Sequence, residues 1–323
     1  MAIQCELCPK YCFLSSGQSG ECRIRINIDD KLLAVTYNHP CAVHIDPIEK
    51  KPLFHFLPGS EILSIATAGC NLHCKNCQNW EISQANPEDM EAYHIPAEEL
   101  LKIALQNKTP SIAYTYTDPF AYYEYTYDSS VLFKKNNIKN VLVTAGYINE
   151  PPLRKLLPFI DAANIDLKAL SDKFYREVCS ATLKPVLETL VITKSMGVEL
   201  EITNLIIPTL NDSDYELTEL SNWIKTNLGK ETPLHFSRFY PHYKMKHLPP
   251  TPSETLLKAR EIAKAQGLEN VYIGNLLTKE GENTYCPKCN KLLIKREGFS
   301  ILENHIKNNG CMFCEKEIYG VWK

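Results

Sequence analysis

The sequence predicts an α/β fold, namely a partial (β/α)6 barrel with a small cysteine-rich module before it and a zinc-ribbon-like module after it. Strand-like and helix-like runs alternate from Glu61 to Asn275, four cysteines gather near the start of the chain, and four more form two Cys-x2-Cys pairs near its end. Repeated alternation of strands and helices indicates a parallel sheet with helices outside it. We therefore expect three parts, which are residues 1–58, 59–279 and 280–323.

The composition is typical of a globular protein. The 323 residues are 44% hydrophobic and 23% charged, with a formal net charge of −3, so we expect no general affinity for nucleic acid or membranes. No apolar run approaches the ~20 residues that a membrane helix needs, and the first residues lack the apolar core of a secretory signal. Thirteen cysteines without such a signal favour metal binding in a reducing cytoplasm over disulfides.

The first part opens with four cysteines spaced Cys-x2-Cys-x3-Cys-x9-Cys, which are Cys5, Cys8, Cys12 and Cys22. Four thiolates this close can bind one zinc ion or one iron–sulfur cluster, or remain free thiols, and the spacing does not decide. Two alternating runs around Asp29 and Asp30 predict a β-hairpin. Residues 44–60 carry three prolines, so we expect an irregular segment across the barrel. His39, His44 and His55 are weaker candidate ligands.

The second part carries the alternating pattern. The expected strands are Glu61–Ala68, Ser111–Thr117, Asn140–Thr144, Ala163–Lys168, Val198–Ile207 and Pro233–Tyr240, with a possible seventh at Asn270–Asn275. The expected helices are Pro96–Asn107, Phe120–Asn136, Pro152–Phe159, Thr182–Met196, Ser213–Leu228 and Pro252–Gln266.

A loop rich in cysteine follows the first of these strands and a glycine turn. It reads CNLHCKNCQNW and carries Cys70, Cys74 and Cys77 with the spacing Cys-x3-Cys-x2-Cys. Three thiolates on one loop can hold three irons of a [4Fe–4S] cluster and leave the fourth iron open to a ligand. A zinc knuckle or three unrelated buried cysteines are the alternatives. The loop would leave the C-terminal end of a strand, where the sites of α/β barrels lie.

This loop, with a parallel α/β pattern behind it, resembles the radical S-adenosylmethionine (SAM) superfamily. The resemblance implies that the open iron chelates the amino and carboxylate groups of SAM. It also implies that the reduced cluster splits the sulfonium to give methionine and a 5′-deoxyadenosyl radical. Asn76 stands where the superfamily usually has an aromatic residue, and its implied contact with adenine runs through the backbone.

The resemblance also implies contacts with SAM at the ends of later strands. Tyr116, Thr117 and Asp118 stand where the superfamily has Gly-Gly-Glu, and Asp118 either accepts from the ammonium of SAM or caps the next helix. Asp166 and Lys168 share one face of a strand and resemble the Asp-Leu-Lys of glycyl-radical-enzyme activases. There Lys168 would meet a carboxylate and Asp166 a ribose or a cation. A simple strand-end ion pair is the alternative.

Other activase features are incomplete. Val143 and Ala145 stand where activases commonly have Asp and Asn, and Thr203 stands where an Arg is often found. His242 follows a proline as the histidine of the activase Pro-Tyr-His segment does, which implies a contact with SAM or substrate. Cys41 and Cys179 have no partners at ligand spacing, so we expect ordinary residues, although a cysteine in a radical site can relay a hydrogen atom.

The third part has two Cys-x2-Cys pairs, formed by Cys286, Cys289, Cys311 and Cys314. This arrangement predicts a zinc ribbon, with a rubredoxin-type iron site as the main rival. The residues between the pairs mix basic and acidic side chains, so we expect a structural or partner-docking module and no nucleic-acid site.

The whole layout resembles the radical SAM proteins of the AmmeMemoRadiSam system, which are relatives of pyruvate formate-lyase activating enzymes. The segments that carry this resemblance include CELCPKYC, DPIEKKPLFHFLPGS, YTYTDP and NTYCPKCNKLLIKREG. It implies a SAM-cleaving enzyme that acts with an AMMECR-like and a MEMO-like protein and takes electrons from a flavodoxin or ferredoxin. A glycyl-radical-enzyme activase is one alternative, and a non-catalytic metal scaffold or electron carrier is another.

Overall fold

The computed structural model describes residues 1–278 and 281–323, and in these ranges the chain has an α/β fold around one large sheet. The sheet has eight strands in the order β12-β11-β10-β9-β8-β7-β6-β5. The strands from β6 (Glu61–Ala66) to β12 (Val271–Gly274) all run parallel to one another. The strands between them are β7 (Ser111–Tyr114), β8 (Lys139–Thr144), β9 (Ala162–Asp166), β10 (Glu199–Ile206) and β11 (Leu234–Arg238).

Helices connect the parallel strands, as the alternating pattern predicts. A side-chain cap begins α7 (Asp214–Leu228), where the Ser213 hydroxyl accepts from the Glu216 backbone N–H over 3.2 Å. The prediction of a parallel α/β unit is therefore confirmed, and its closure into a partial barrel stays a prediction. The connecting helices are α2 (Ala97–Gln106), α3 (Tyr123–Lys135), α4 (Glu150–Leu156), α6 (Leu183–Ser195), α7 (Asp214–Leu228) and α8 (Ser253–Ala265).

An antiparallel edge strand corrects the prediction for residues 44–60. We expected an irregular segment there because of its prolines, but β5 (Ala42–Pro47) includes its first residues and pairs with β6 from Ala42–Ala66 to Pro47–Glu61. A proline is tolerated at the end of an edge strand because its nitrogen needs no partner. The irregular part begins after it, with the 3₁₀ turn η1 (Ile48–Lys50).

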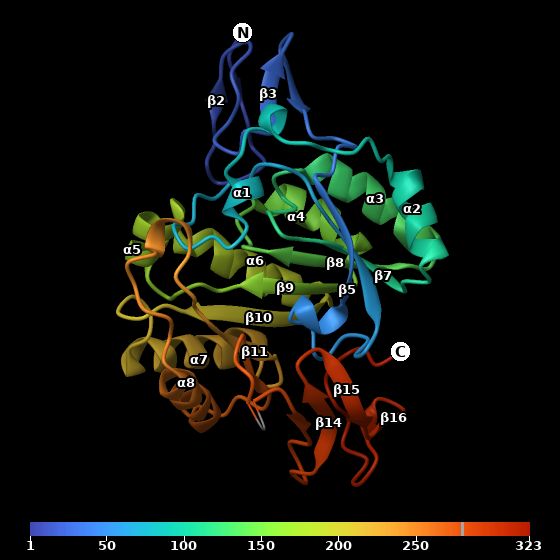
Figure 1. Cartoon of the computed structure of the whole chain (residues 1–323), viewed down its shortest axis with the longest axis vertical. Helices are drawn as coiled ribbons and strands as arrows, with labels where there is room; N and C mark the ends of the chain where they lie inside the picture. The colour runs from blue at the N-terminus through green and yellow to red at the C-terminus, as the bar shows by residue number, and fades with distance from the viewer. Residues whose placement is uncertain (279–280) are drawn as a thin grey trace.

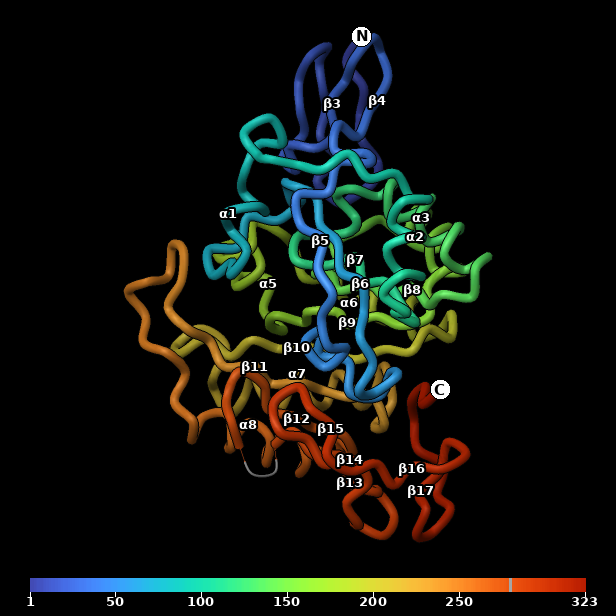
Figure 2. The backbone as a smooth tube through the Cα atoms, turned by 45° about the vertical axis from the view of Figure 1, so that its right-hand side comes forward, coloured from blue at the N-terminus to red at the C-terminus, as the bar shows by residue number. Residues whose placement is uncertain are grey.

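The N-terminal module is built from two small antiparallel pairs. One pair joins β1 (Ile3–Gln4) to β2 (Phe13–Leu14), and the other is the predicted hairpin of β3 (Arg25–Ile28) and β4 (Lys31–Ala34). Asp29 and Asp30 at the hairpin turn have positive φ angles of 49° and 58°, as the favoured two-residue turn requires. Figures 1 and 2 show this module and the C-terminal module at opposite ends of the molecule.

The C-terminal module is a set of short antiparallel strands, as predicted. It docks beside β5 and β6, where the Leu57 backbone N–H donates to the Val321 carbonyl oxygen over 2.7 Å. The predicted boundary between residues 279 and 280 lies outside the described residues, and the three-part division stays a prediction. No helix in the described ranges has the length and apolar composition needed to cross a bilayer. The strands are β13 (Thr284–Tyr285), β14 (Leu292–Glu297), β15 (Ser300–Asn304), β16 (Ile306–Lys307) and β17 (Gly310–Cys311).

Candidate active site

A loop with three cysteines leaves the C-terminal end of β6 and runs to the short helix α1 (Trp80–Ser83). Figure 1 shows that β8 and β9 point their C-terminal ends toward the side on which α1 lies. Gly69 turns the loop with a φ of 89°, and a Cβ there would lie 2.5 Å from the Cys22 carbonyl oxygen, so this position needs glycine. The loop therefore starts at the edge where parallel sheets carry their ligand sites. Its cysteines are Cys70, Cys74 and Cys77, and we call it the cysteine loop.

Side-chain amides attach the cysteine loop to the ends of the next two strands. The Asn79 side chain donates to the Tyr116 carbonyl oxygen, after β7, over 2.7 Å. The Asn71 side chain donates to the Tyr147 carbonyl oxygen, after β8, over 2.8 Å. Because both partners are backbone atoms at strand ends, the sheet itself positions the loop.

Two of the three thiols lie among hydrogen-bond donors, with Cys70 buried and Cys77 partly buried. Burial raises the pKa of Cys70 well above its usual value and raises the pKa of Cys77 as well. The Leu72 backbone N–H donates to the Cys70 sulfur over 3.4 Å, and the Ser83 hydroxyl lies 3.2 Å from the Cys77 sulfur. Such thiols stay protonated until a metal replaces the proton. Three soft sulfur donors with hydrogen bonds to them are a donor set that fits an iron–sulfur cluster.

A fourth cysteine lies beside the loop, and its sequence spacing did not indicate it. Cys179 ends the π-helical turn η4 (Tyr175–Cys179), and its carbonyl oxygen accepts from the His73 backbone N–H over 3.1 Å. Its buried thiol hydrogen-bonds to the Cys74 sulfur, and this contact lowers the pKa of Cys74. We expected an ordinary residue because nothing near Cys179 in sequence marks a site, and only the tertiary fold corrects this.

Asp166 and Lys168 lie at the C-terminal end of β9, where the sequence predicted them. The Lys168 ammonium donates to Asp166 over 2.7 Å, so the ion pair that we considered is present. Burial alone would lower the pKa of Lys168, but the charges of Asp166 and Cys74 raise it well above its usual value. The structure thus holds a permanent cation beside the cysteine loop.

Asp118 is buried and has protein partners for its carboxylate. Thr144 and the backbone N–H groups of Ala145 and Phe120 donate to it over 2.9 to 3.0 Å. Burial raises the pKa of Asp118 to about 6, although these donors act in the opposite direction. The carboxylate fixes the turn before α3 and joins the ends of β7 and β8, but it does not cap α3, whose N-cap is Tyr122.

Tyr116 and Thr117 also have protein partners. Tyr116 has a φ of 62°, and its hydroxyl donates to the Asp46 carboxylate. The Thr117 hydroxyl donates to the Thr67 carbonyl oxygen over 3.1 Å. Both residues therefore hold the end of β7 against the edge of the sheet, and neither hydroxyl is left free in the structure.

The other predicted contact residues differ in their exposure and in whether their side chains have hydrogen-bond partners. The Thr203 hydroxyl donates to the Asn164 side chain over 2.8 Å. His242 is partly exposed in the loop after β11. Asn76 is 7% exposed, and its side-chain oxygen is buried without a hydrogen-bond partner among the described residues. A buried oxygen without a partner is costly, so Asn76 marks a position where a bound ligand would supply the missing donor.

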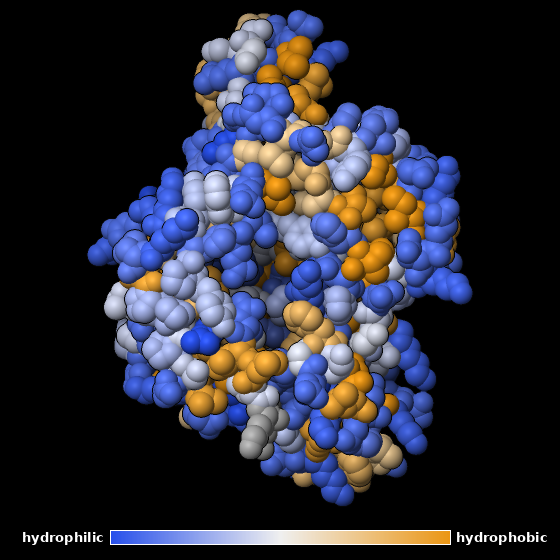
Figure 3. Space-filling view, in the orientation of Figure 1, coloured by the Kyte–Doolittle hydropathy of each residue, from blue (hydrophilic) through white to orange (hydrophobic). Residues whose placement is uncertain are grey.

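The loop after β11 folds over the cysteine loop. The Lys244 backbone N–H donates to the Lys75 carbonyl oxygen over 3.1 Å. The rings of Trp80 and Tyr243 stack with centroids 5.0 Å apart and an angle of 11° between their planes. These contacts bring the stretch that carries His242 next to the cysteine loop. Figure 3 shows a hollow near the centre of the face seen in Figure 1, bordered mostly by hydrophilic residues.

The four C-terminal cysteines form a compact site. The sulfurs of Cys286 and Cys314 lie 3.6 Å apart, and those of Cys289 and Cys311 lie 3.7 Å apart. A tetrahedral metal with sulfur at ~2.3 Å requires sulfurs ~3.8 Å apart, so the geometry fits a single metal ion. The four N-terminal cysteines, Cys5, Cys8, Cys12 and Cys22, line a separate cavity that Asn71 also borders.

The three candidate histidines join no group of metal ligands in the described residues. His55 is buried, with Nδ1 2.6 Å from the Tyr319 carbonyl oxygen and Nε2 2.6 Å from the Tyr272 hydroxyl. His39 Nε2 lies 3.3 Å from His94 Nδ1 at the surface. These partners give His39 and His55 ordinary hydrogen-bonding roles.

Known proteins resemble this chain over most of its length. Residues 64–220 match the family model described as the radical SAM superfamily. An uncharacterised protein of Methanocaldococcus jannaschii is 47% identical over 98% of this chain and 95% of its own length. The pyruvate formate-lyase-activating enzyme of Clostridium pasteurianum is 26% identical over 49% of this chain and 66% of its own length.

Solved structures share the fold. SuiB of Streptococcus suis bound to precursor peptide SuiA matches with a TM-score of 0.53 and 17% identity, over 71% of this chain and 51% of that chain. Another structure of Streptococcus suis SuiB matches with a TM-score of 0.51 and 14% identity, over 66% of this chain and 50% of that chain. At these identities the likeness shows the fold alone, and this chain spans about half of SuiB.

Proposed function

Because this chain belongs to the radical SAM superfamily, we propose that it is an enzyme that cleaves SAM reductively at a [4Fe–4S] cluster. The observation that carries the proposal is the cysteine loop at the end of β6, which lies inside the matched residues 64–220. When bound, the cluster and SAM supply a 5′-deoxyadenosyl radical, formed with methionine by one-electron cleavage of the sulfonium, that abstracts hydrogen from a substrate. We propose a substrate that is protein-linked or presented by a partner.

The chain's own residues bind and orient these groups in this proposal. Cys70, Cys74 and Cys77 would bind three irons and leave the fourth for SAM. Lys168 would attract the carboxylate of SAM, since its charge is fixed beside the loop. The loop that carries His242 packs over the cysteine loop and would keep water from the reacting atoms. The parallel sheet would form the partial barrel around them.

For the compact C-terminal cysteine site we propose zinc. Its sulfur distances fit one tetrahedral ion, and a structural ion would hold the short strands of the module together. Metal analysis of the Cys311→Ser variant tests this, with loss of about one zinc per chain expected and an unchanged iron content. Loss of iron without sulfide from this variant would instead identify a rubredoxin-type site.

We also propose membership of the AmmeMemoRadiSam system, with an AMMECR-like and a MEMO-like protein as partners and a flavodoxin or ferredoxin as electron donor. The resemblance along the chain supports this proposal. Co-expression of the three proteins, followed by anaerobic size-exclusion chromatography of the intact chain, tests it. Separate elution of all three at micromolar concentration would contradict a stable complex.

Activation of a glycyl-radical enzyme is a second candidate function, which the similarity to a pyruvate formate-lyase-activating enzyme favours. The same radical would then abstract hydrogen from a backbone glycine of the partner. An electron paramagnetic resonance (EPR) doublet of a glycyl radical on the partner, seen only with SAM and a reductant, would decide for this function.

SAM cleavage by the anaerobic protein is the main test. We expect 5′-deoxyadenosine and methionine in equal amounts after reduction with dithionite, and at least a hundredfold less from Cys74→Ala. Cys41→Ala is the matched control, because Cys41 lies on the neighbouring edge of the sheet, where its thiol donates to the Ala66 carbonyl oxygen. If the wild-type protein binds iron but forms neither product with any reductant, the metal-scaffold alternative holds and the proposal fails.

A further inference from the structure

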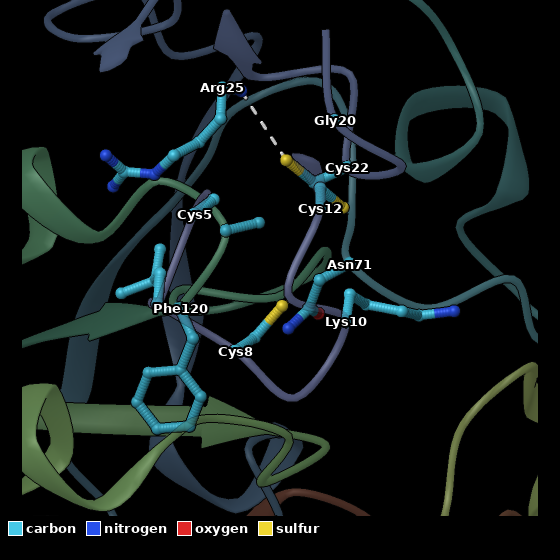
Figure 4. Close-up of a pocket in the computed structure, with 11 residues that line it drawn as sticks. Cys5, Cys8, Lys10, Cys12, Gly20, Cys22, Arg25, Asn71 and Phe120 are labelled. Atoms are coloured by element: carbon cyan, nitrogen blue, oxygen red, sulfur yellow. Dashed lines mark hydrogen bonds between the residues drawn. The ribbon is translucent and has the colours of Figure 1, made fainter. Parts of the chain in front are cut away.

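The N-terminal cysteines surround a cavity at the base of their module. Backbone hydrogen bonds stabilise the wall of this cavity. The Cys5 N–H donates to the Cys12 carbonyl oxygen over 2.8 Å, and the Gly20 N–H donates to the Arg25 carbonyl oxygen over 2.8 Å. Figure 4 shows Cys12 and Cys22 on one side of the cavity and Cys8 beside Asn71 on the opposite side, with Phe120 below them. Cys8 and Cys22 come from two separate turns, Cys5 and Cys12 flank the first of these, and all four line one space.

The distances between sulfurs distinguish this site from the C-terminal one. In the described parts of the chain, only the C-terminal four cysteines form a group of three or more ligands whose ligand atoms all lie within 4.8 Å of one another. No three of the N-terminal cysteines come that close together. Because a single tetrahedral ion needs its sulfurs ~3.8 Å apart, the N-terminal arrangement is too open for one zinc ion.

The cysteine loop provides a comparison within the same molecule. Cys70, Cys74 and Cys77 are also absent from that compact group, although they are the proposed cluster ligands. Each thiolate of a cluster binds a different iron, so the sulfurs around a cluster lie farther apart than those around one ion. The N-terminal cysteines share the open arrangement of the cysteine loop and not the compact one of the C-terminal site.

A buried cation borders the cavity. Arg25 donates from its backbone N–H to the Cys22 sulfur over 3.5 Å, and its side chain is only 8% exposed. The guanidinium pairs with Glu124 over 2.6 Å, but its Nε is buried without a hydrogen-bond partner within the described ranges. A cluster with four thiolate ligands carries net negative charge, so a buried guanidinium at its edge would stabilise it.

From this geometry we infer that Cys5, Cys8, Cys12 and Cys22 bind a second iron–sulfur cluster. It would lie next to the first, because Asn71 borders the cavity and directly follows Cys70 in the chain. Gly69 also brings the start of the cysteine loop against the Cys22 carbonyl oxygen. The inference concerns what the cavity holds and does not depend on the cleavage of SAM.

Metal and sulfide analysis of anaerobic full-length protein tests the inference. In a variant with Cys70, Cys74 and Cys77 all changed to Ala, we expect iron and acid-labile sulfide to remain in equal amounts, with absorption near 400 nm typical of a cluster. About one zinc per chain should remain with it. Adding Cys8→Ala and Cys12→Ala should remove the remaining iron and sulfide but leave the zinc.

The wild-type protein gives a second measurement that does not depend on how the variants fold. We expect more sulfide than the four per chain of a single [4Fe–4S] cluster, together with one zinc. Two zinc ions per chain and no sulfide in the triple variant would overturn the inference, as would iron without sulfide or no metal at this site. SAM cleavage is measured separately, so a failure of the proposed function would leave a different pattern.

Discussion

The thiol of Cys179 forms a hydrogen bond with the Cys74 sulfur of the cysteine loop. The contact is fixed by the backbone on both sides, since the N–H groups of His73 and Lys75 donate to the carbonyl oxygens of Cys179 and Val178 over 3.1 and 2.8 Å. Hydrogen bonds to ligand sulfurs are one of the ways in which a protein sets the reduction potential of a cluster. Cys179 is therefore placed to tune the proposed SAM-binding cluster without binding iron.

Replacement of Cys179 by Ala should make that cluster harder to reduce. The hydrogen bond favours the reduced, more negative state, so its loss should lower the midpoint potential by about 50 mV, the equivalent of roughly one hydrogen bond. A redox titration followed by EPR measures the shift. Cys179→Ser keeps a donor and should restore most of the potential, and Cys41→Ala should leave it unchanged. Equal potentials in wild type and Cys179→Ala would contradict this role.

Gly69→Ala should destabilise the protein more than a glycine substitution in open space. A Cβ at Gly69 would lie 2.5 Å from the Cys22 carbonyl oxygen and 2.8 Å from the Ile24 side chain, and the backbone has a φ of 89°. Gly197 is the matched control, with a φ of 78° and nothing within 4 Å of an added Cβ. Urea unfolding should show a loss of about 1 kcal/mol for Gly197→Ala and roughly 3 kcal/mol for Gly69→Ala.

That difference isolates the contact between the cysteine loop and the N-terminal module from the cost of the backbone angle. Both variants carry the angle cost, but only Gly69→Ala pushes the two cysteine-bearing segments apart. Similar losses for the two variants would mean that the close approach of Gly69 to Cys22 does not matter for stability.

Local patterns account for the parts of the fold that the sequence predicted. The parallel strands and their helices follow from apolar periodicity and end signals, and the residues of the cysteine loop follow from their spacing. The strand β5 was missed because Pro47 and the prolines after it indicate irregular structure, and only pairing with β6 makes a strand there. In that case tertiary pairing outweighed a local signal.

The features that the sequence did not indicate depend on contacts between residues far apart in the chain. Cys179 meets Cys74 across the fold, and no spacing rule connects cysteines so far apart in sequence. Arg296 is likewise completely buried, although a Lys-Arg pair in a short strand predicts an exposed face. Contacts between residues far apart in sequence decided both positions, and these contacts leave no periodic pattern in the sequence.

Arg296→Met should weaken the docking of the C-terminal module. The Arg296 guanidinium donates to the Phe54 carbonyl oxygen over 2.7 Å and to the Thr284 hydroxyl over 2.8 Å, and lies 4.0 Å from the buried Glu49. Removal of one buried charge leaves the other unpaired, so we expect a loss of about 3 to 5 kcal/mol in urea unfolding. The exposed neighbour Lys295 is the control, and Lys295→Met should cost about 0.5 kcal/mol or less.

A second substitution separates the charge effect from the loss of packing. Glu49→Gln in the Arg296→Met background removes the unpaired carboxylate, so it should recover part of the stability. If the double variant is as unstable as the single one, the two charges do not interact and the loss comes from packing alone.

The buried imidazole of His55 should make the protein less stable in acid. Its Nδ1 donates to the Tyr319 carbonyl oxygen and its Nε2 accepts from the Tyr272 hydroxyl, and burial lowers the pKa of His55 to about 3. Between about pH 6.5 and pH 3 the unfolded chain binds a proton at this residue and the folded chain does not. The contribution of His55 to the free energy of unfolding therefore falls as the pH falls through this window.

Comparison with His55→Gln isolates this contribution, because the other titrating groups are common to both proteins. The difference in unfolding free energy between wild type and variant should shrink by about 2 kcal/mol from pH 7 to pH 5, measured by urea unfolding at each pH. Between pH 7.5 and pH 8.5 the imidazole is neutral in both states, so the difference should stay constant there. Parallel pH profiles from pH 5 to pH 7 would mean that the folded protein accommodates a charged His55.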